Sequence, residues 1–168
     1  METLKILDEI GVNVDDQTQK VIDILEQKKA VSENKLATAL EVKVNVVRKS
    51  LYKLNSLGFA YYFRKKDKRK KWWYLYYWSL DKKRLREAYI RHKQAMLDQK
   101  MVEMADEQTF SFRCRKKCRK FAYSAALEAE FKCPECGSVL VEAQNGKRIK
   151  SLLAEIEELQ NELNGQLE

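Results

Sequence analysis

Several residue types are scarce in this chain of 168 residues, and each scarcity narrows what the protein can be. The sequence has one histidine, five glycines and four cysteines. It therefore offers no cluster of histidine ligands, no glycine-rich loop to hold phosphates, and no Ser or Cys paired with a candidate base. A zinc hydrolase or a thiol oxidoreductase would need such groups, so we do not expect an enzyme.

Long apolar runs are also absent. No stretch approaches the roughly 18 apolar residues of a membrane span. The first residues, Met1-Glu-Thr-Leu, lack the basic and apolar regions of a signal peptide. We therefore expect a cytoplasmic, nucleoid-associated protein with no membrane partner. A reducing compartment favours metal binding over disulfide formation for the cysteines.

All four cysteines fall within one window of 23 residues, as Cys114-x3-Cys118 and Cys133-x2-Cys136. Spacers of two to four residues let both thiolates of a pair turn toward one metal, and two such pairs complete the tetrahedral shell of Zn²⁺. Because four thiolates leave no position for water or substrate, we predict one structural zinc in a small β-ribbon. The alternatives are unrelated buried thiols and a redox dithiol, but the latter motif belongs in a βαβ context.

The charge of the chain is concentrated in its middle. Residues 42–120 contain 24 Lys and Arg against seven Asp and Glu, a net charge of +17, whereas the segments before and after carry −4 and −5. A field of one sign in one stretch favours a polyanionic partner. Nucleic acid and an acidic protein surface both satisfy that description.

The first half of the chain has the pattern of a winged helix-turn-helix. Helices are predicted over residues 17–29, from an N-cap at Ser32, and over residues 44–57, where Gly58 ends the third helix. Aromatic-rich segments at 59–63 and 72–78 then suit the two strands of a hairpin with a charged tip. In such a domain the third helix is the usual reader of DNA.

The second half predicts two further helices around the ribbon. Residues 79–108 contain no Gly or Pro, which favours one long helix, and an apolar stripe of coiled-coil spacing follows the ribbon at Ile149, Leu152, Ile156, Leu159 and Leu163. This last helix is too short to stand alone, so it packs on the long helix, on a second copy or on another subunit. The predicted fold is mainly α with small β: a winged-helix domain at 1–80, a long helical linker at 81–108, a zinc ribbon at 109–146 and a C-terminal amphipathic helix at 147–168.

Three motifs together resemble archaeal transcription factor E, the counterpart of the α subunit of eukaryotic TFIIE. They are Val47-Arg-Lys-Ser-Leu-Tyr-Lys-Leu54, the segment 67–78 with its Trp-Tyr-Leu-Tyr-Tyr-Trp close, and Phe131-Lys-Cys-Pro-Glu-Cys-Gly137 preceded by Ala126-Leu-Glu128. The resemblance covers nearly the whole chain. It departs from the family at the first knuckle, which resembles Cys-x2-Cys there and is Cys114-x3-Cys118 here. The backbone hydrogen bonds of that knuckle are therefore expected to differ.

The resemblance implies a basal transcription initiation factor without enzymatic activity. Such a factor binds the clamp and stalk of RNA polymerase in a complex with the TATA-binding protein and TFB-type factors. Its wing would lie near the upstream edge of the bubble, close to the non-template strand of promoter DNA, and would support DNA melting. Whether a β-like subunit pairs with the C-terminal region stays open.

The residues give this implication a physical basis. Seven of the eight positions from 64 to 71 are cationic, which suits phosphates of any sequence. Beside them, Trp72 and Trp73 can stack on unpaired bases. The candidate nucleic-acid-binding residues are Arg64, Lys65, Lys66, Lys68, Arg69, Lys70, Lys71, Trp72 and Trp73. The alternative is a solvated hairpin tip, and strand alternation predicts that Trp72 or Trp73 packs on the core, together with Tyr74, Tyr76 and Trp78.

Two other surfaces carry alternatives. Lys49 and Lys53 on the third helix could read bases in a major groove, whereas the resemblance implies that Asn45, Lys49, Tyr52 and Lys53 contact polymerase. A second basic cluster, residues 113–120, carries six cations around the first knuckle and suits nucleic acid and an acidic polymerase surface equally. The competing function is a sequence-specific dimeric regulator that reads an operator with the third helix and dimerises through the C-terminal helix.

Overall fold

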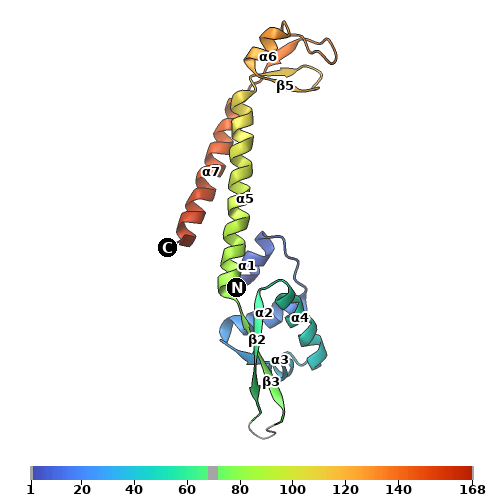
Figure 1. Ribbon diagram of the computed structural model, residues 1–168, viewed down its shortest axis with the longest axis vertical. Helices are drawn as coiled ribbons and strands as arrows, with labels where there is room; N and C mark the ends of the chain where they lie inside the picture. The colour runs from blue at the N-terminus through green and yellow to red at the C-terminus, as the bar shows by residue number, and fades with distance from the viewer. Residues whose placement is uncertain (1, 68–71, 168) are drawn as a thin grey trace. The chain divides into compact units, whose positions relative to one another are not determined.

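The computed structural model describes residues 2–67 and 72–167. Contacts within the chain divide it into two compact units, residues 1–92 and 93–168, and helix α5, Lys82–Thr109, contributes to both. Figure 1 shows the order of the elements. Among the helices of the described residues, none is both long enough and apolar enough to cross a bilayer.

The first unit contains helices α1, α2, α3 and α4, which span Glu2–Glu9, Asp16–Gln27, Glu33–Ala39 and Val44–Ser56. Local chemistry sets their ends. The Asp15 carboxylate accepts the Thr18 N–H at 2.9 Å, and the Ser32 hydroxyl accepts the Lys35 N–H at 3.4 Å. After α4, Gly58 adopts a φ of 78°, a left-handed conformation that few other residues tolerate. The predicted cap at Ser32 and stop at Gly58 are thus confirmed.

Helix α1 is missing from the predicted elements. Its Leu7 is fully buried, and Leu4 and Ile10 pack against the same core. The spacing of three residues between Leu4, Leu7 and Ile10 is the helical signal that could have found it.

A three-stranded antiparallel sheet closes the first unit. Strands β1, β2 and β3 span Val31–Ser32, Ala60–Lys66 and Tyr74–Leu80, in the order β1-β3-β2, and Tyr62 lies opposite Trp78. Trp78 is 1% exposed and joins a core shared with Ile22, Leu36 and Leu51. Helices α2 to α4 and this sheet form a winged helix-turn-helix, as predicted.

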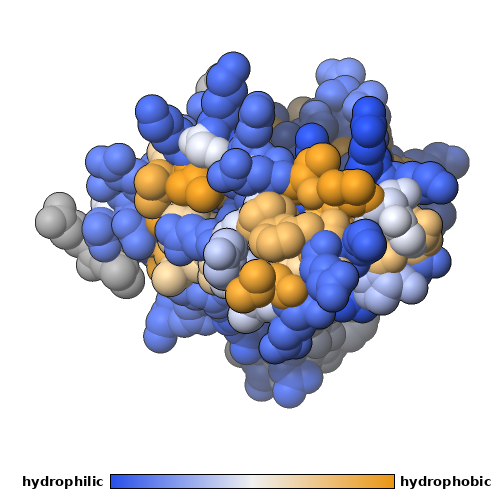
Figure 2. Space-filling view, turned by 90° about the horizontal axis from the view of Figure 1, so that it is seen from above, coloured by the Kyte–Doolittle hydropathy of each residue, from blue (hydrophilic) through white to orange (hydrophobic). Residues whose placement is uncertain are grey.

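The second unit contains a ribbon with a very small core. Strands β4, β5 and β6 span Phe112–Cys114, Lys120–Phe121 and Leu140–Glu142 in the order β5-β4-β6, with the unpredicted short helix α6, Tyr123–Glu128, between β5 and β6. The buried residues are Cys114, Phe121, Ala126, Cys133 and Leu140. Leu127 and Val139 stay exposed. Figure 2, which shows the molecule from above, shows that apolar side chains reach the surface there between hydrophilic ones. A core of this size holds a ribbon together poorly without a crosslink.

The C-terminal helix α7, Gly146–Leu167, packs within its own chain. Its stripe of Leu152, Ile156, Leu159 and Leu163 is at most 8% exposed. Figure 1 shows α7 alongside α5, and ion pairs join the two helices: Lys93 to Glu162 at 2.7 Å and Lys100 to Glu155 at 2.6 Å. Of the three packing partners expected for this helix, the long helix is the one that the chain provides.

Candidate metal centre and nucleic-acid surface

Strand pairing brings the two cysteine knuckles together. Cys114 ends the central strand β4 and lies opposite Leu140 of β6, just after the second knuckle in the chain. The second knuckle is itself closed by a bridge between Lys132 and Val139 and by the Cys133 N–H, which donates to the Ser138 carbonyl at 2.8 Å. Residues 22 positions apart therefore meet in one corner of the ribbon, where the Cys114 and Cys136 sulfurs are 3.4 Å apart.

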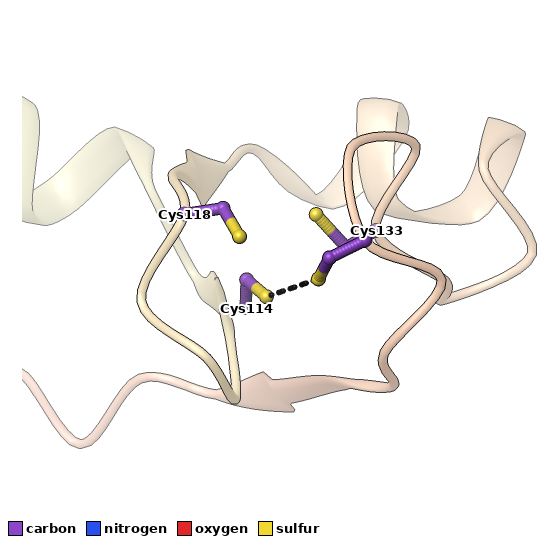
Figure 3. A group of neighbouring side chains, drawn as sticks. Cys114, Cys118 and Cys133 are labelled. Carbon is purple, nitrogen blue, oxygen red and sulfur yellow. Dashed lines mark hydrogen bonds between the residues drawn. The ribbon is translucent and has the colours of Figure 1, made fainter.

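All four sulfurs form one compact cluster. They lie within 4.8 Å of one another, and Figure 3 shows Cys114, Cys118 and Cys133 directed toward a common centre. A tetrahedral metal with bonds of about 2.3 Å to sulfur separates its ligands by about 3.8 Å. The four side chains could therefore hold one metal ion after small adjustments.

The thiols of the cluster influence one another's protonation. Hydrogen bonds from the Ser138 side chain and N–H lower the pKa of Cys136 to about 6. Hydrogen bonding of the Cys118 thiol with the sulfurs of Cys136 and Cys114 favours its protonated form and raises its pKa to about 12, and the charge of a neighbouring thiolate adds to this effect. A bound cation would remove that penalty and let all four thiols ionise.

The wing places the predicted cations along one strand. Arg64, Lys65 and Lys66 lie in β2 and are exposed, and the Asp67 N–H donates to the Trp73 carbonyl at 2.8 Å. Lys68, Arg69, Lys70 and Lys71, the rest of the predicted basic run, lie outside the described residues.

The wing exposes both Trp72 and Trp73, so the prediction from strand alternation that one of them packs on the core is wrong. Trp72 is 73% exposed and Trp73 is 52% exposed, whereas Trp78 alone of the three is buried. The reason is that β3 begins only at Tyr74, so the two residues before it follow the turn and not the pleat. Tyr74 and Tyr76 are also partly open, at 38% and 39%.

The aromatic rings of the hairpin divide between its two faces. On one face Tyr62 contacts Tyr76 and Trp78 with centroids at 5.6 and 5.0 Å, and Tyr52 of α4 meets Trp78 edge-on at 5.6 Å. On the other face, Phe63 stacks on Tyr77 at 5.7 Å, with the Lys65 ammonium over both rings. The wing is thus stiffened by its own aromatic pairs.

The four candidate residues of α4 are all exposed, as expected. They differ in how far they are engaged within the chain. The Lys53 ammonium donates to the Asn13 carbonyl at 3.2 Å and lies 3.5 Å from the Asp15 carboxylate, which places it over the start of α2. Asn45 and Lys49 face outward beside it.

A buried polar network between α3, α4 and β3 was not predicted from the sequence. The Glu33 side chain is only 7% exposed, and it accepts the Arg48 Nε–H at 2.7 Å and the Trp78 Nε1–H at 3.1 Å. Glu33 raises the pKa of Arg48 further above its ordinary value. The network joins α3, α4 and β3. Acidic residues are common in the first turn of a helix, so Glu33 by itself gave no sign in the sequence that it would be buried.

Comparisons with known proteins identify relatives along nearly the whole chain. The model of the TFIIE alpha subunit family matches residues 5–109. Transcription factor E of Thermococcus kodakarensis is 38% identical over 96% of this chain and 86% of its own. The protein of the same name from Sulfurisphaera tokodaii is 30% identical over 89% of this chain and 84% of its own.

Among solved structures, a protein described as a possible transcriptional regulator from Methanosarcina mazei Go1 aligns with 60% of this chain and 83% of its own, at 16% identity and a TM-score of 0.46. The family assignment rests instead on the sequence relatives, whose similarity extends through both compact units. The chain belongs to the TFIIE alpha subunit family, together with the archaeal proteins named transcription factor E.

Proposed function

We propose that this chain is a basal transcription initiation factor that binds RNA polymerase and stabilises melted promoter DNA, with no catalysis of its own. The observation that carries the proposal is the pair of exposed tryptophans, Trp72 and Trp73, at the end of a cationic hairpin. Family membership supports a role in transcription, and the wing supplies a physical means of favouring open DNA.

The wing combines two kinds of contact. Its cations neutralise phosphates in any sequence, with an affinity that falls steeply as salt rises. Its exposed indole rings stack on unpaired bases, at about 1 to 3 kcal/mol each. Stacking is available from melted DNA and largely unavailable from a closed duplex, so binding shifts the equilibrium toward the open form.

The metal that best fits the cysteine cluster is Zn²⁺. Four sulfurs within 4.8 Å of one another suit its tetrahedral thiolate coordination, and no fifth group is needed. Cys114, Cys118, Cys133 and Cys136 would be the ligands. When bound, zinc would supply a crosslink to a ribbon whose own core is very small, and no reaction chemistry.

The exposed face of α4 is the proposed polymerase contact. Lys53 and Arg48 already have partners within the chain, which leaves few cations on this helix to read base edges. As the family resemblance implies, Asn45, Lys49, Tyr52 and Lys53 would face the clamp and the ribbon would face the stalk. The TATA-binding protein and a TFB-type factor would share the complex, with the wing near the non-template strand at the upstream edge of the bubble.

The dimeric regulator is the weaker proposal. Its dimer seam would have to be the apolar stripe of α7, and that stripe is already buried against α5 in a single chain. Exposing it again would cost the burial of four large side chains, each worth about 1.5 to 3 kcal/mol.

The proposed function is tested by co-purification with archaeal RNA polymerase after nuclease treatment, at about 0.3 M salt to weaken purely electrostatic adsorption. We expect a stoichiometric complex. Failure to form one, combined with tight binding to a single palindromic duplex, would replace the initiation factor with the sequence-specific regulator.

A further inference from the structure

The ribbon carries a second concentration of positive charge, in the compact unit that does not contain the wing. Six cations surround the first knuckle, and all are exposed. They are Arg113, Arg115, Lys116, Lys117, Arg119 and Lys120. Neither the predicted zinc nor the wing accounts for them.

The backbone of this loop is held in a defined shape. The Lys117 N–H donates to the Cys114 carbonyl at 2.9 Å, the Cys114 N–H donates to the Arg119 carbonyl at 3.1 Å, and Lys117 has a φ of 60°. Cys114 and Cys118, which flank the tripeptide 115–117, both belong to the cluster of four sulfurs. Its three exposed cations therefore extend from one hydrogen-bonded turn.

Internal partners engage the two cations that follow Cys118 in the chain. Lys120 pairs with Glu107, and the Arg119 guanidinium lies 3.9 Å from the Glu135 carboxylate and 4.7 Å over the Phe121 ring. Within the described part of the chain, no carboxylate lies within 4.0 Å of the cationic groups of Arg113, Arg115, Lys116 or Lys117. These four cations therefore repel one another, and binding an external anion would reduce that repulsion.

The composition of the loop favours phosphates over a protein surface. Lysine is depleted from the centres of protein interfaces, and the tripeptide Arg115-Lys116-Lys117 offers no apolar side chain to bury. Point charges on long side chains suit phosphates, which accept hydrogen bonds from many directions. We propose that residues 113–117 form a second nucleic-acid-binding surface that holds the sugar–phosphate backbone of any sequence.

The proposal has a measurable size. For single strands, log K falls with log salt at a slope of about −0.7 for each phosphate contact. If the tripeptide makes three contacts, its removal reduces the slope by about 2 and weakens binding about 100-fold at about 0.1 M salt. The wing contributes equally to DNA binding by the unaltered protein and by the variant without these three cations, so its contribution cancels when the two slopes are compared.

The test uses the full chain and a fluorescent oligodeoxythymidine, titrated between about 50 and 200 mM salt. The ribbon variant combines Arg115→Gln, Lys116→Gln and Lys117→Gln. A control variant with the same loss of charge combines Lys82→Gln, Lys147→Gln and Lys150→Gln, three exposed lysines on α5 and α7. Zinc content and circular dichroism establish that the ribbon is intact; if the triple variant fails to fold, Lys116→Gln alone should reduce the slope by about 0.7.

We expect the ribbon variant to lose about two units of slope while the control loses much less. Equal losses in the two variants would overturn the proposal, because they would reflect the diffuse field of the chain and not a site. A ribbon variant that binds the oligonucleotide like the unaltered protein would also overturn it. In that case a loss of polymerase retention would assign the loop to an acidic protein surface.

Discussion

Removing the two exposed tryptophans of the wing should separate promoter opening from polymerase binding. In the double variant Trp72→Ala and Trp73→Ala, the wing keeps its cations but loses its stacking faces. The rings contact each other edge-on at 5.6 Å, and each is more than half exposed. Truncation should therefore cost the fold no more than the roughly 1.5 kcal/mol of an aromatic pair.

The expected effect on DNA is larger. Trp72, 73% exposed, can offer a full face to a base, whereas Trp73, 52% exposed, can offer a partial one. With about 1 to 3 kcal/mol for the first stack and about 1 kcal/mol for the second, the variant should lose about 2 to 4 kcal/mol of preference for open DNA. The ratio of open to closed complexes should then fall by at least about 30-fold.

The assay is permanganate reactivity of unpaired thymines in assembled initiation complexes, at a temperature where opening is incomplete without the factor. Polymerase retention is measured in parallel by co-purification. Replacing both residues with Phe preserves flat rings and should restore most of the reactivity. Tyr123→Ala, which removes a 60% exposed ring in the other compact unit, should leave the reactivity unchanged.

Unchanged thymine reactivity in the double alanine variant, with polymerase still retained, would refute the stacking argument. A parallel loss of reactivity and retention would refute it too, since the tryptophans would then be part of the polymerase contact.

Three further predictions concern the structural supports of the two units. Cys133→Ser should release zinc and unfold the ribbon, because two of the five buried residues of that core are cysteines, while the winged helix remains folded; a variant that still binds one zinc per chain by atomic absorption would contradict the four-thiolate site. Arg48→Ala leaves the buried Glu33 carboxylate without its ion-pair partner, so it should lower the free energy of unfolding in urea by about 2 kcal/mol. The loss is smaller than for a fully buried ion pair because the Arg48 side chain is about half exposed. Lys49→Ala, its exposed neighbour, should change that energy by about 0.5 kcal/mol at most, and equal effects would rule out the network. The Thr18 N–H holds the pKa of Asp15 below its ordinary value of 3.8, so the stabilisation that the Asp15 carboxylate gives the fold should be complete above pH 3.8 and be lost as the pH falls further. Unfolding measured across an acid titration would show this loss. Asp15→Asn should abolish it, and an acid profile that Asp15→Asn leaves unchanged would contradict the prediction.

Much of the fold could be predicted because its signals are local. A hydroxyl at Ser32, a glycine at Gly58 and apolar residues at helical spacing act on their own neighbours, so they mark the same boundaries in any tertiary setting. The cysteine cluster was predictable for a related reason. Short spacers restrict each pair of thiols to a common direction, and only one pair of knuckles exists in the chain.

The sequence by itself thus determined the helices and hairpin strands of the winged helix-turn-helix from α2 onward, the two long helices and the four cysteines able to hold a metal, but neither α1 nor α6. Only the tertiary structure decided which aromatic rings face solvent, because that depends on β3 starting at Tyr74 and not two residues earlier. It also decided that Glu33 would be buried under Arg48 and Trp78, partners 15 and 45 positions away. Such long-range pairs arise when separate elements pack together, and no local pattern encodes their meeting.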